Sequence, residues 1–183
     1  MLTKLLNLGG FQIGWFMCVL SPSYGFFYAG EISMGLYIFF ALSQLKDKQS
    51  ALLRILIIGT LGATTDGILA QLGIISFPTA TENWSPSYLY AIWYGFAAAL
   101  EIPLSWLKGR YVLASLLGSV FGPLNYLAGA NLGAISFLFS QNATLFIIAV
   151  SWAIQLPLLL AISNRLTDKL IFTAVLSPNK VDT

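Results

Sequence analysis

Three acidic residues lie inside long apolar stretches of this 183-residue chain and are its strongest candidates for chemistry: Glu31, Asp66 and Glu101. No base is expected at the same depth in the membrane to pair with them, although Lys108, about two helix turns beyond Glu101, could reach back to it and make Glu101 structural. An ionised carboxyl in the middle of a bilayer costs at least about 2.5 kcal/mol. Asp66 lies roughly 18 Å along a helix from both Arg54 and Pro78, which is near the bilayer centre. We therefore expect Asp66 to be neutral unless water or a cation reaches it.

The three acids are expected at different depths, as in the relay of titratable groups that a proton or cation pathway requires. Asp66 also interrupts a stripe of small residues that includes Gly59, Gly62 and Gly73. A later stretch repeats this pattern around Asn125, which suggests a hydrogen bond between the Asn125 amide and the Asp66 carboxyl. Polar side chains that only hold helices together are the structural alternative.

Two further polar residues join the candidate binding set. Tyr94 shares a polar helical strip with Glu101, one helix turn being about 3.6 residues. Gln155 precedes Pro157 by two positions, as Glu101 precedes Pro103, so Gln155 is the uncharged counterpart of the glutamates. Prolines inside membrane helices free backbone carbonyls and are frequent beside binding sites. The predicted solute- or ion-binding residues are Asp66, Asn125, Glu101, Glu31, Gln155 and Tyr94.

The composition indicates a membrane protein. Hydrophobic residues make up 57% of the chain and charged residues only 9%, against roughly a quarter charged in a soluble domain. Stretches of about 20 apolar residues cross a bilayer as helices. The sequence predicts an all-α, polytopic fold with six such helices at approximately 3–20, 24–42, 52–77, 88–107, 111–137 and 143–163. Residues 1–163 form the predicted transmembrane domain, and residues 164–183 a short cytoplasmic tail.

The basic residues predict the orientation of these helices. Segments that contain Lys or Arg alternate along the chain with connections that contain neither. The basic segments are the N-terminal end with Lys4, the Lys46 to Arg54 connection, the Lys108 to Arg110 turn and the tail. This distribution predicts that both termini lie in the cytoplasm. Aromatic residues suit the opposite boundary: Trp84, Tyr88, Tyr90 and Trp93, near the outer acid Glu82.

Internal similarity predicts duplicated helix pairs. Tyr24-Gly25-Phe26 followed by Glu31-Ile32 recurs as Tyr94-Gly95-Phe96 followed by Glu101-Ile102. The segment from Ala70 to Phe77 recurs 60 positions later, from Ala130 to Phe137. Chance similarity among apolar segments is the alternative. If the duplication is real, the paired helices run in the same direction, as in transporters built from parallel repeats.

Several kinds of chemistry are not expected. The chain has no histidine and one cysteine, Cys18, so neither a transition-metal site nor an internal disulfide is predicted, and no cofactor is expected. The net charge of +2 comes from scattered basic residues, which does not favour a nucleic-acid partner. No catalytic residue stands out, because Thr64, Thr65 and Asp66 are adjacent on a helix and point apart.

Three segments resemble an uncharacterised family of small proteobacterial inner-membrane proteins built on a domain of unknown function. They are Phe11-Gln12-x-Gly14-Trp15-Phe16 with Cys18-Val19-Leu20, the segment 62–68 around Asp66, and the segment from Gly122-Pro123-Leu124 to Gly133. The resemblance covers the chain to about Leu160. It implies the bacterial inner membrane and a role linked to envelope lipids, and it carries over no catalytic residue.

The leading hypothesis is therefore a transporter-like protein that moves a small solute, proton or lipid-like substrate, with Asp66 and Asn125 central and Glu101 and Glu31 beside them. One alternative is a lipid-modifying enzyme or accessory subunit that uses Asp66 or Glu101 as an acid or base. Another is a structural partner of a membrane protein, or a homo-oligomer, associating through the glycine stripes.

Overall fold

The computed structural model describes residues 1–26, 28–78 and 85–176, and the side chains of these residues as far as Asp168. Six α-helices make up nearly all of this part of the chain: α1 (Leu2–Leu20), α2 (Ala29–Ser43), α3 (Lys48–Gln71), α4 (Ser87–Glu101), α5 (Tyr111–Asn131) and α6 (Gln141–Leu176). Two 3-10 turns, η1 (Ser21–Tyr24) and η2 (Ser105–Leu107), and two short strands, β1 (Ile75–Ser76) and β2 (Ser136–Phe137), connect them. The predicted all-α class and the number of helices are confirmed.

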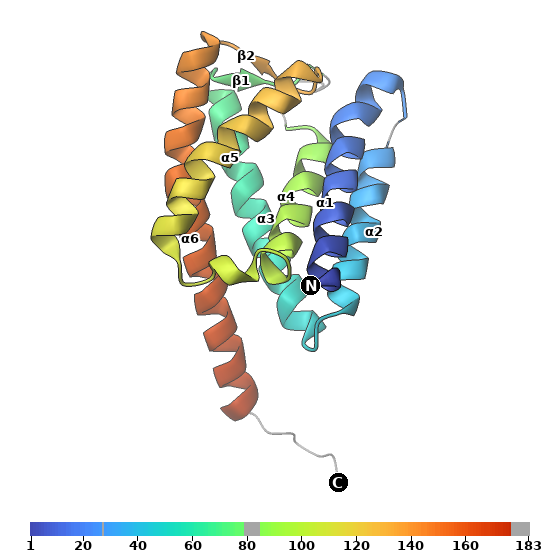
Figure 1. Ribbon diagram of the computed structural model, residues 1–183, viewed down its shortest axis with the longest axis vertical. Helices are drawn as coiled ribbons and strands as arrows, with labels where there is room; N and C mark the ends of the chain where they lie inside the picture. The colour runs from blue at the N-terminus through green and yellow to red at the C-terminus, as the bar shows by residue number, and fades with distance from the viewer. Residues whose placement is uncertain (27, 79–84, 177–183) are drawn as a thin grey trace.

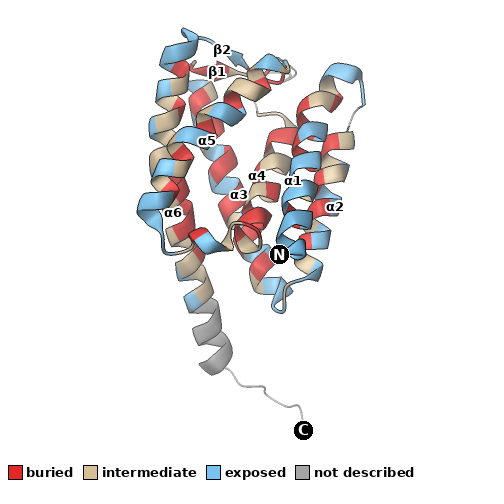
Figure 2. Cartoon of the chain, viewed as in Figure 1, coloured by how far each residue is buried: buried red, intermediate tan, exposed pale blue. Residues whose placement is uncertain are grey.

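The helices run alternately up and down, so that α1 begins and α6 ends at the same end of the bundle (Figure 1). α1 packs against α2 and α4, whereas α5 packs mainly against α6. α3 contacts both α4 and α6 and therefore links the two groups. Buried residues face these contacts, and exposed residues point outward around the bundle (Figure 2).

The outward surface is apolar, as a bilayer requires. Large hydrophobic side chains are exposed on several helices, among them Phe39, Val112 and Phe146, which are 74%, 78% and 71% exposed. α1, α3, α5 and the first part of α6 are long and apolar enough to cross a membrane. α2 and α4 are shorter, with 15 residues each. These features indicate a multi-pass membrane protein, and the crossing of all six helices stays a prediction.

Several helix boundaries differ from the prediction because glycine and proline end helices within apolar sequence. α3 and α5 stop at Gln71 and Asn131, just before Gly73 and Gly133, whose φ angles of +68° and +81° favour glycine. α4 stops at Glu101, before Pro103, and does not continue to Leu107. The Ala99 carbonyl, predicted to be freed by Pro103, accepts a hydrogen bond from the Leu104 N–H at 2.9 Å.

The other two differences lie at the second and sixth helices. α2 begins at Ala29 and not at Tyr24, because Gly25 and Tyr28 have φ angles of 74° and 64°. α6 continues to Leu176, so the segment predicted as a separate tail starts inside a helix. Pro157 lies within α6, as Pro123 lies within α5.

The proposed aromatic boundary is partly wrong. Tyr88 and Trp93 are only 4% and 3% exposed, so neither side chain reaches a membrane surface. The Tyr88 hydroxyl donates to the Ala134 carbonyl at 2.8 Å inside the bundle. Glu82 and Trp84 lie outside the described residues.

The ends of α3 and α5 have the same backbone conformation. In each, three successive N–H groups donate to carbonyls four, three and five positions earlier. After α3 the bonds are Leu72 to Ile68, Gly73 to Ala70 and Ile74 to Leu69. After α5 they are Leu132 to Ala128, Gly133 to Ala130 and Ala134 to Gly129. The strands that follow pair antiparallel, with Ser76 opposite Ser136. Ser76 and Ser136 are 60 positions apart and are also aligned with each other in the sequence comparison.

Two glycines of α2 provide a matched test of helix packing. A Cβ added at Gly30 would collide with the backbone of Cys18 in α1, whereas one added at Gly35 meets nothing within 4 Å. We expect Gly30→Ala to lower the free energy of unfolding in detergent by about 1–3 kcal/mol, as overpacking does. Gly35→Ala should leave it unchanged or raise it by up to about 1 kcal/mol through helix propensity. Equal stability of the two variants would show that α1 and α2 do not pack this closely.

Candidate functional site

Asp66 joins three helices through its two carboxyl oxygens. The residue lies in α3 and is 2% exposed. Its Oδ2 accepts a hydrogen bond from the Trp93 indole of α4 at 2.7 Å, and its Oδ1 accepts one from the Tyr126 hydroxyl of α5. Asp66 has no ion-pair partner among the described side chains. A polar group in hydrocarbon is therefore satisfied by two neutral donors from different helices.

The small residues around Asp66 make this arrangement possible. A Cβ at Gly62, one turn before Asp66, would overlap the Trp93 ring. A Cβ at Gly59 would overlap the Tyr94 ring. The glycine stripe predicted from sequence thus lets two aromatic side chains of α4 lie directly against α3.

The predicted hydrogen bond between Asp66 and Asn125 is wrong. The Asn125 amide donates to the Phe121 carbonyl of its own helix at 2.8 Å, and its side chain is exposed. Tyr126 is the residue that reaches Asp66. Successive residues on a helix are rotated by about 100°, so Asn125 and Tyr126 face different directions. Tyr126 already belonged to the motif that carried the family resemblance, which was the available signal for it.

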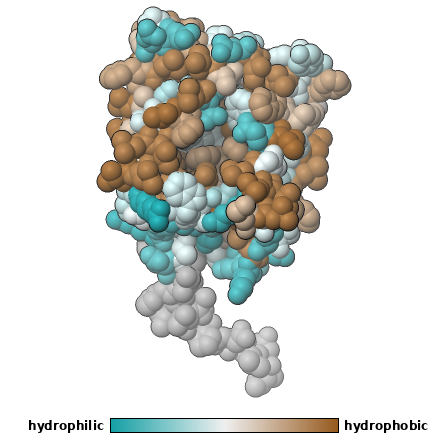
Figure 3. Space-filling model, in the orientation of Figure 1, coloured by the Kyte–Doolittle hydropathy of each residue, from teal (hydrophilic) through white to brown (hydrophobic). Residues whose placement is uncertain are grey.

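A cavity of about 590 Å³ lies beside Asp66. Its walls come from α1 and α4 on one side and from α5 and α6 on the other, and Figure 3 shows the corresponding hollow between two largely apolar flanks. Most lining side chains are apolar or aromatic, for example Phe11, Trp15, Phe96, Phe121, Trp152 and Leu156. Among the described residues of the lining, Asp66 is the only acidic one, and none of them is basic.

Aromatic rings from three helices stack beside Asp66. Trp93 of α4 lies parallel to Trp152 of α6, with ring centroids 5.3 Å apart and an interplanar angle of 18°. The Phe96 ring makes T-shaped contacts with both indoles, at centroid distances of 5.7 Å from Trp93 and 5.5 Å from Trp152. Phe11 of α1 continues the row, 6.4 Å from Phe96. The cavity wall next to the carboxyl is therefore a continuous aromatic surface.

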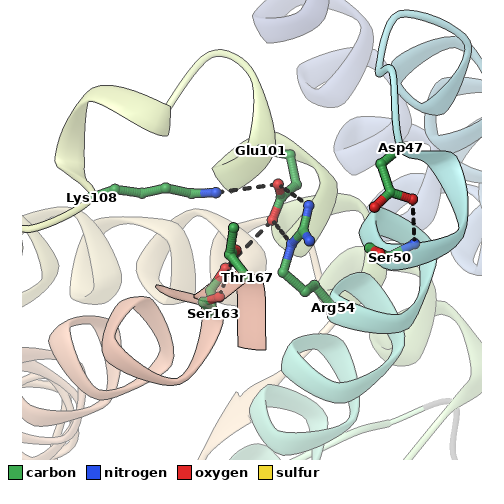
Figure 4. Close-up of polar contacts among 7 residues, drawn as sticks. All are labelled: Asp47, Ser50, Arg54, Glu101, Lys108, Ser163 and Thr167. Carbon is green, nitrogen blue, oxygen red and sulfur yellow. Dashed lines mark hydrogen bonds and ion pairs between the residues drawn. The ribbon is translucent and has the colours of Figure 1, made fainter. Parts of the chain in front are cut away.

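Glu101 lies in a separate polar cluster at the end of α4 (Figure 4). Its carboxylate accepts hydrogen bonds from Arg54 at 3.1 and 2.9 Å, from Lys108 at 3.2 Å and from Ser163 at 3.4 Å. The expectation that no intramembrane base pairs with the acids is thus wrong for Glu101, because Arg54 does, whereas the alternative contact with Lys108 is confirmed. Arg54 was assigned to a connection between helices, but it lies inside α3 and is 9% exposed. This geometry supports a structural ion pair.

The remaining predicted residues also occupy places of their own. Glu31 accepts a hydrogen bond from the Ser87 hydroxyl at 2.5 Å. The Tyr94 hydroxyl lies 3.2 Å from the Thr60 hydroxyl, between α3 and α4. Gln155 is 7% exposed, and neither atom of its amide has a hydrogen-bond partner in the described structure. Of the six predicted residues, Asp66 and Asn125 line the cavity, so the three acids do not converge on one interior.

Sequence reasoning missed the donors and rings that define the site: Trp93, Phe96, Tyr126 and Trp152. The glycines gave an indirect signal, because a Cβ at Gly118 or Gly122 of α5 would collide with Trp152. A small residue lets the backbone or a large side chain of the facing helix approach closely. The sequence alone does not say which helix faces which.

The Glu101 cluster makes a direct stability prediction. Glu101→Gln leaves Arg54 and Lys108 without their shared carboxylate, and breaking a buried ion pair typically costs about 3–5 kcal/mol. We expect a loss of this size in the free energy of unfolding, measured in detergent. Asp47→Asn is the matched control, because Asp47 caps α3 through the Ser50 N–H and asparagine caps equally well. If Glu101→Gln is as stable as Asp47→Asn, the ion pair contributes nothing.

Comparison with known proteins places the chain in a family. Residues 4–158 match the family described as "Protein of unknown function (DUF2878)". No curated protein and no solved structure matches the chain. The match includes α1 to α5 and the part of α6 that carries Trp152. Because it covers most of the chain, the protein belongs to the DUF2878 family of proteins of unknown function, which confirms the resemblance seen in the sequence.

Proposed function

We propose that the protein binds a lipid-like molecule in the cavity between α1, α4, α5 and α6 and moves it across the membrane. The observation that carries this proposal is a cavity of about 590 Å³ with mainly apolar walls, in which the described lining residues contribute one carboxyl group, that of Asp66. Cavities of roughly 300–1,000 Å³ that combine apolar walls with few polar groups are typical small-molecule sites. The apolar walls suit a hydrocarbon chain better than a hydrated solute.

The extent of the cavity supports movement across the membrane. Its lining runs along α1 from Leu8 to Val19 and along α4 from Tyr88 to Ala99. At about 1.5 Å per residue, each of these stretches spans roughly 16 Å, about half of a hydrocarbon core of about 30 Å. An elongated molecule in this cavity would pass the depth of Asp66.

The orientation and location are part of the proposal. The bilayer crossed by six helices is the bacterial inner membrane, with both termini and the Arg54–Glu101–Lys108 cluster on the cytoplasmic side. The distribution of basic residues supports this orientation. The transmembrane domain comprises residues 1–163, and the end of α6 leads into the cytoplasmic tail.

We also infer that α3 and α5, with the strands that follow them, arose by duplication. The equivalent turn hydrogen bonds, the positive φ angles of Gly73 and Gly133, and the pairing of Ser76 with Ser136 support this. The predicted copies α2 and α4 have equal lengths of 15 residues. The two halves would then lie around an axis along the membrane normal.

A substitution that fills the cavity tests the proposed function. Asn125 is exposed on α5 and lines the cavity, so Asn125→Phe should fill it without disturbing the Asp66 hydrogen bonds. We expect 1-bromododecane to quench the tryptophan fluorescence of the wild-type protein in phosphatidylcholine nanodiscs, because Trp15, Trp93, Trp106 and Trp152 line the cavity. Quenching should fall several-fold in Asn125→Phe.

Leu124→Phe is the control, since Leu124 is 52% exposed on the same helix and does not line the cavity. It should behave as the wild type does. Transfer between leaflets is measured separately, with a fluorescent alkyl lipid in vesicles and a membrane-impermeant quencher. Equal quenching and equal transfer rates for the wild-type protein and both variants would contradict the proposal.

A further inference from the structure

We propose that the polar end of the bound molecule is a monovalent organic cation, such as an alkylammonium group, and that the Asp66 carboxylate neutralises it. This inference rests on the proposed function, because it names the chemical class of the ligand for the same cavity. It follows from the charges, rings and open acceptor positions around Asp66.

The charge distribution favours a cation over an anion. Asp66 is the only acid among the described residues that line the cavity. Its two hydrogen-bond donors, the Trp93 indole and the Tyr126 hydroxyl, are neutral groups. Both ion pairs within the described side chains involve Glu101. One of these pairs contains Arg54 of α3, which lies roughly 18 Å along the helix from Asp66 and is therefore not beside it. An anionic headgroup here would face a carboxyl with no base beside it, whereas a cation would supply the missing charge.

The aromatic wall fits the same class of ligand. The faces of tryptophan, tyrosine and phenylalanine rings attract organic cations within about 6 Å of the ring centroid. Four such rings form a contiguous group at the Asp66 carboxyl: Trp93, Trp152, Phe96 and Tyr126. A carboxylate set among such rings combines the two interactions that hold a bulky ammonium ion with little water.

Asp66 keeps acceptor positions for an alkylammonium group that carries N–H, whereas a quaternary ammonium ion would be held by its charge and by the ring faces. A carboxylate offers about four acceptor positions on its two oxygens. One hydrogen bond to each oxygen accounts for two of them. A hard metal ion fits less well, because it would need several oxygen ligands, and no group of three or more His, Cys, Asp or Glu side chains is gathered in the described ranges.

The test compares three probes that share a dodecyl chain: dodecyltrimethylammonium, 1-dodecanol and dodecanoate. Binding to the protein in phosphatidylcholine nanodiscs is measured by tryptophan fluorescence. We expect the wild-type protein to bind the cation about tenfold or more tightly than the alcohol, which corresponds to about 1.4 kcal/mol, and dodecanoate most weakly. This order needs no variant, so the inference can be tested even if a substitution at Asp66 prevents folding.

Two variants assign the preference to a residue. Asp66→Asn should bind the cation no better than the alcohol. Glu31→Gln removes an acid that contacts Ser87 outside the cavity, so it should keep the preference of the wild type. A preference that persists in folded Asp66→Asn would overturn the assignment to Asp66. Equal binding of cation and alcohol by the wild type would overturn the inference and leave the proposed function standing, whereas binding of neither would contradict both.

Discussion

The architecture depends on the carboxyl group of Asp66, which a helix in hydrocarbon cannot leave unsatisfied. Trp93 of α4 and Tyr126 of α5 both donate to it, so one side chain of α3 holds helices from the two groups of the bundle. Helices in a membrane gain little from burying apolar surface, so such polar contacts and close packing decide which helices meet. The pair of Arg54 and Glu101 fixes α3 to α4 a second time, near the other end of α3. The cavity lies next to the first of these contacts.

The sequence predicted the helices better than their ends or their contacts. Apolar length and the spacing of basic residues were sufficient for six helices, because both follow from the thickness of the bilayer. The ends of α3 and α5 were missed because Gly73 and Gly133 are as apolar as their neighbours, and only their left-handed backbone breaks the helix. Asp66 was placed near the bilayer centre because its distance along the helix from Arg54 and Pro78 can be read from the sequence. Its partners were not recognised, because Trp93 and Tyr126 come from helices whose relative rotation the sequence does not give.

Glu101 and Asp66 show how similar residues acquire different roles. Both are acids within apolar sequence, and both were assigned to one relay. Two bases and a hydroxyl contact the Glu101 carboxylate in the structure. They stabilise its charged form and use its oxygens for contacts between helices. The structure gives Asp66 two neutral donors and a cavity. The difference lies in Arg54, whose long side chain reaches Glu101 from within α3. We therefore propose a single binding group, Asp66, in place of a relay through the three acids. Glu31 and Glu101 form hydrogen bonds between helices.

The Asp66 carboxyl joins three helices, and we propose that it also receives the charged end of a lipid-like ligand. The most direct measurement is a structure determined with a bromine-tagged dodecyltrimethylammonium ion bound. We expect the ammonium group beside the Asp66 carboxyl, against the rings of Trp93 and Trp152, and the bromine inside the cavity between α1 and α5. Bromine found solely on the outer, lipid-facing surface, with Asp66 still contacting only Trp93 and Tyr126, would contradict the proposal.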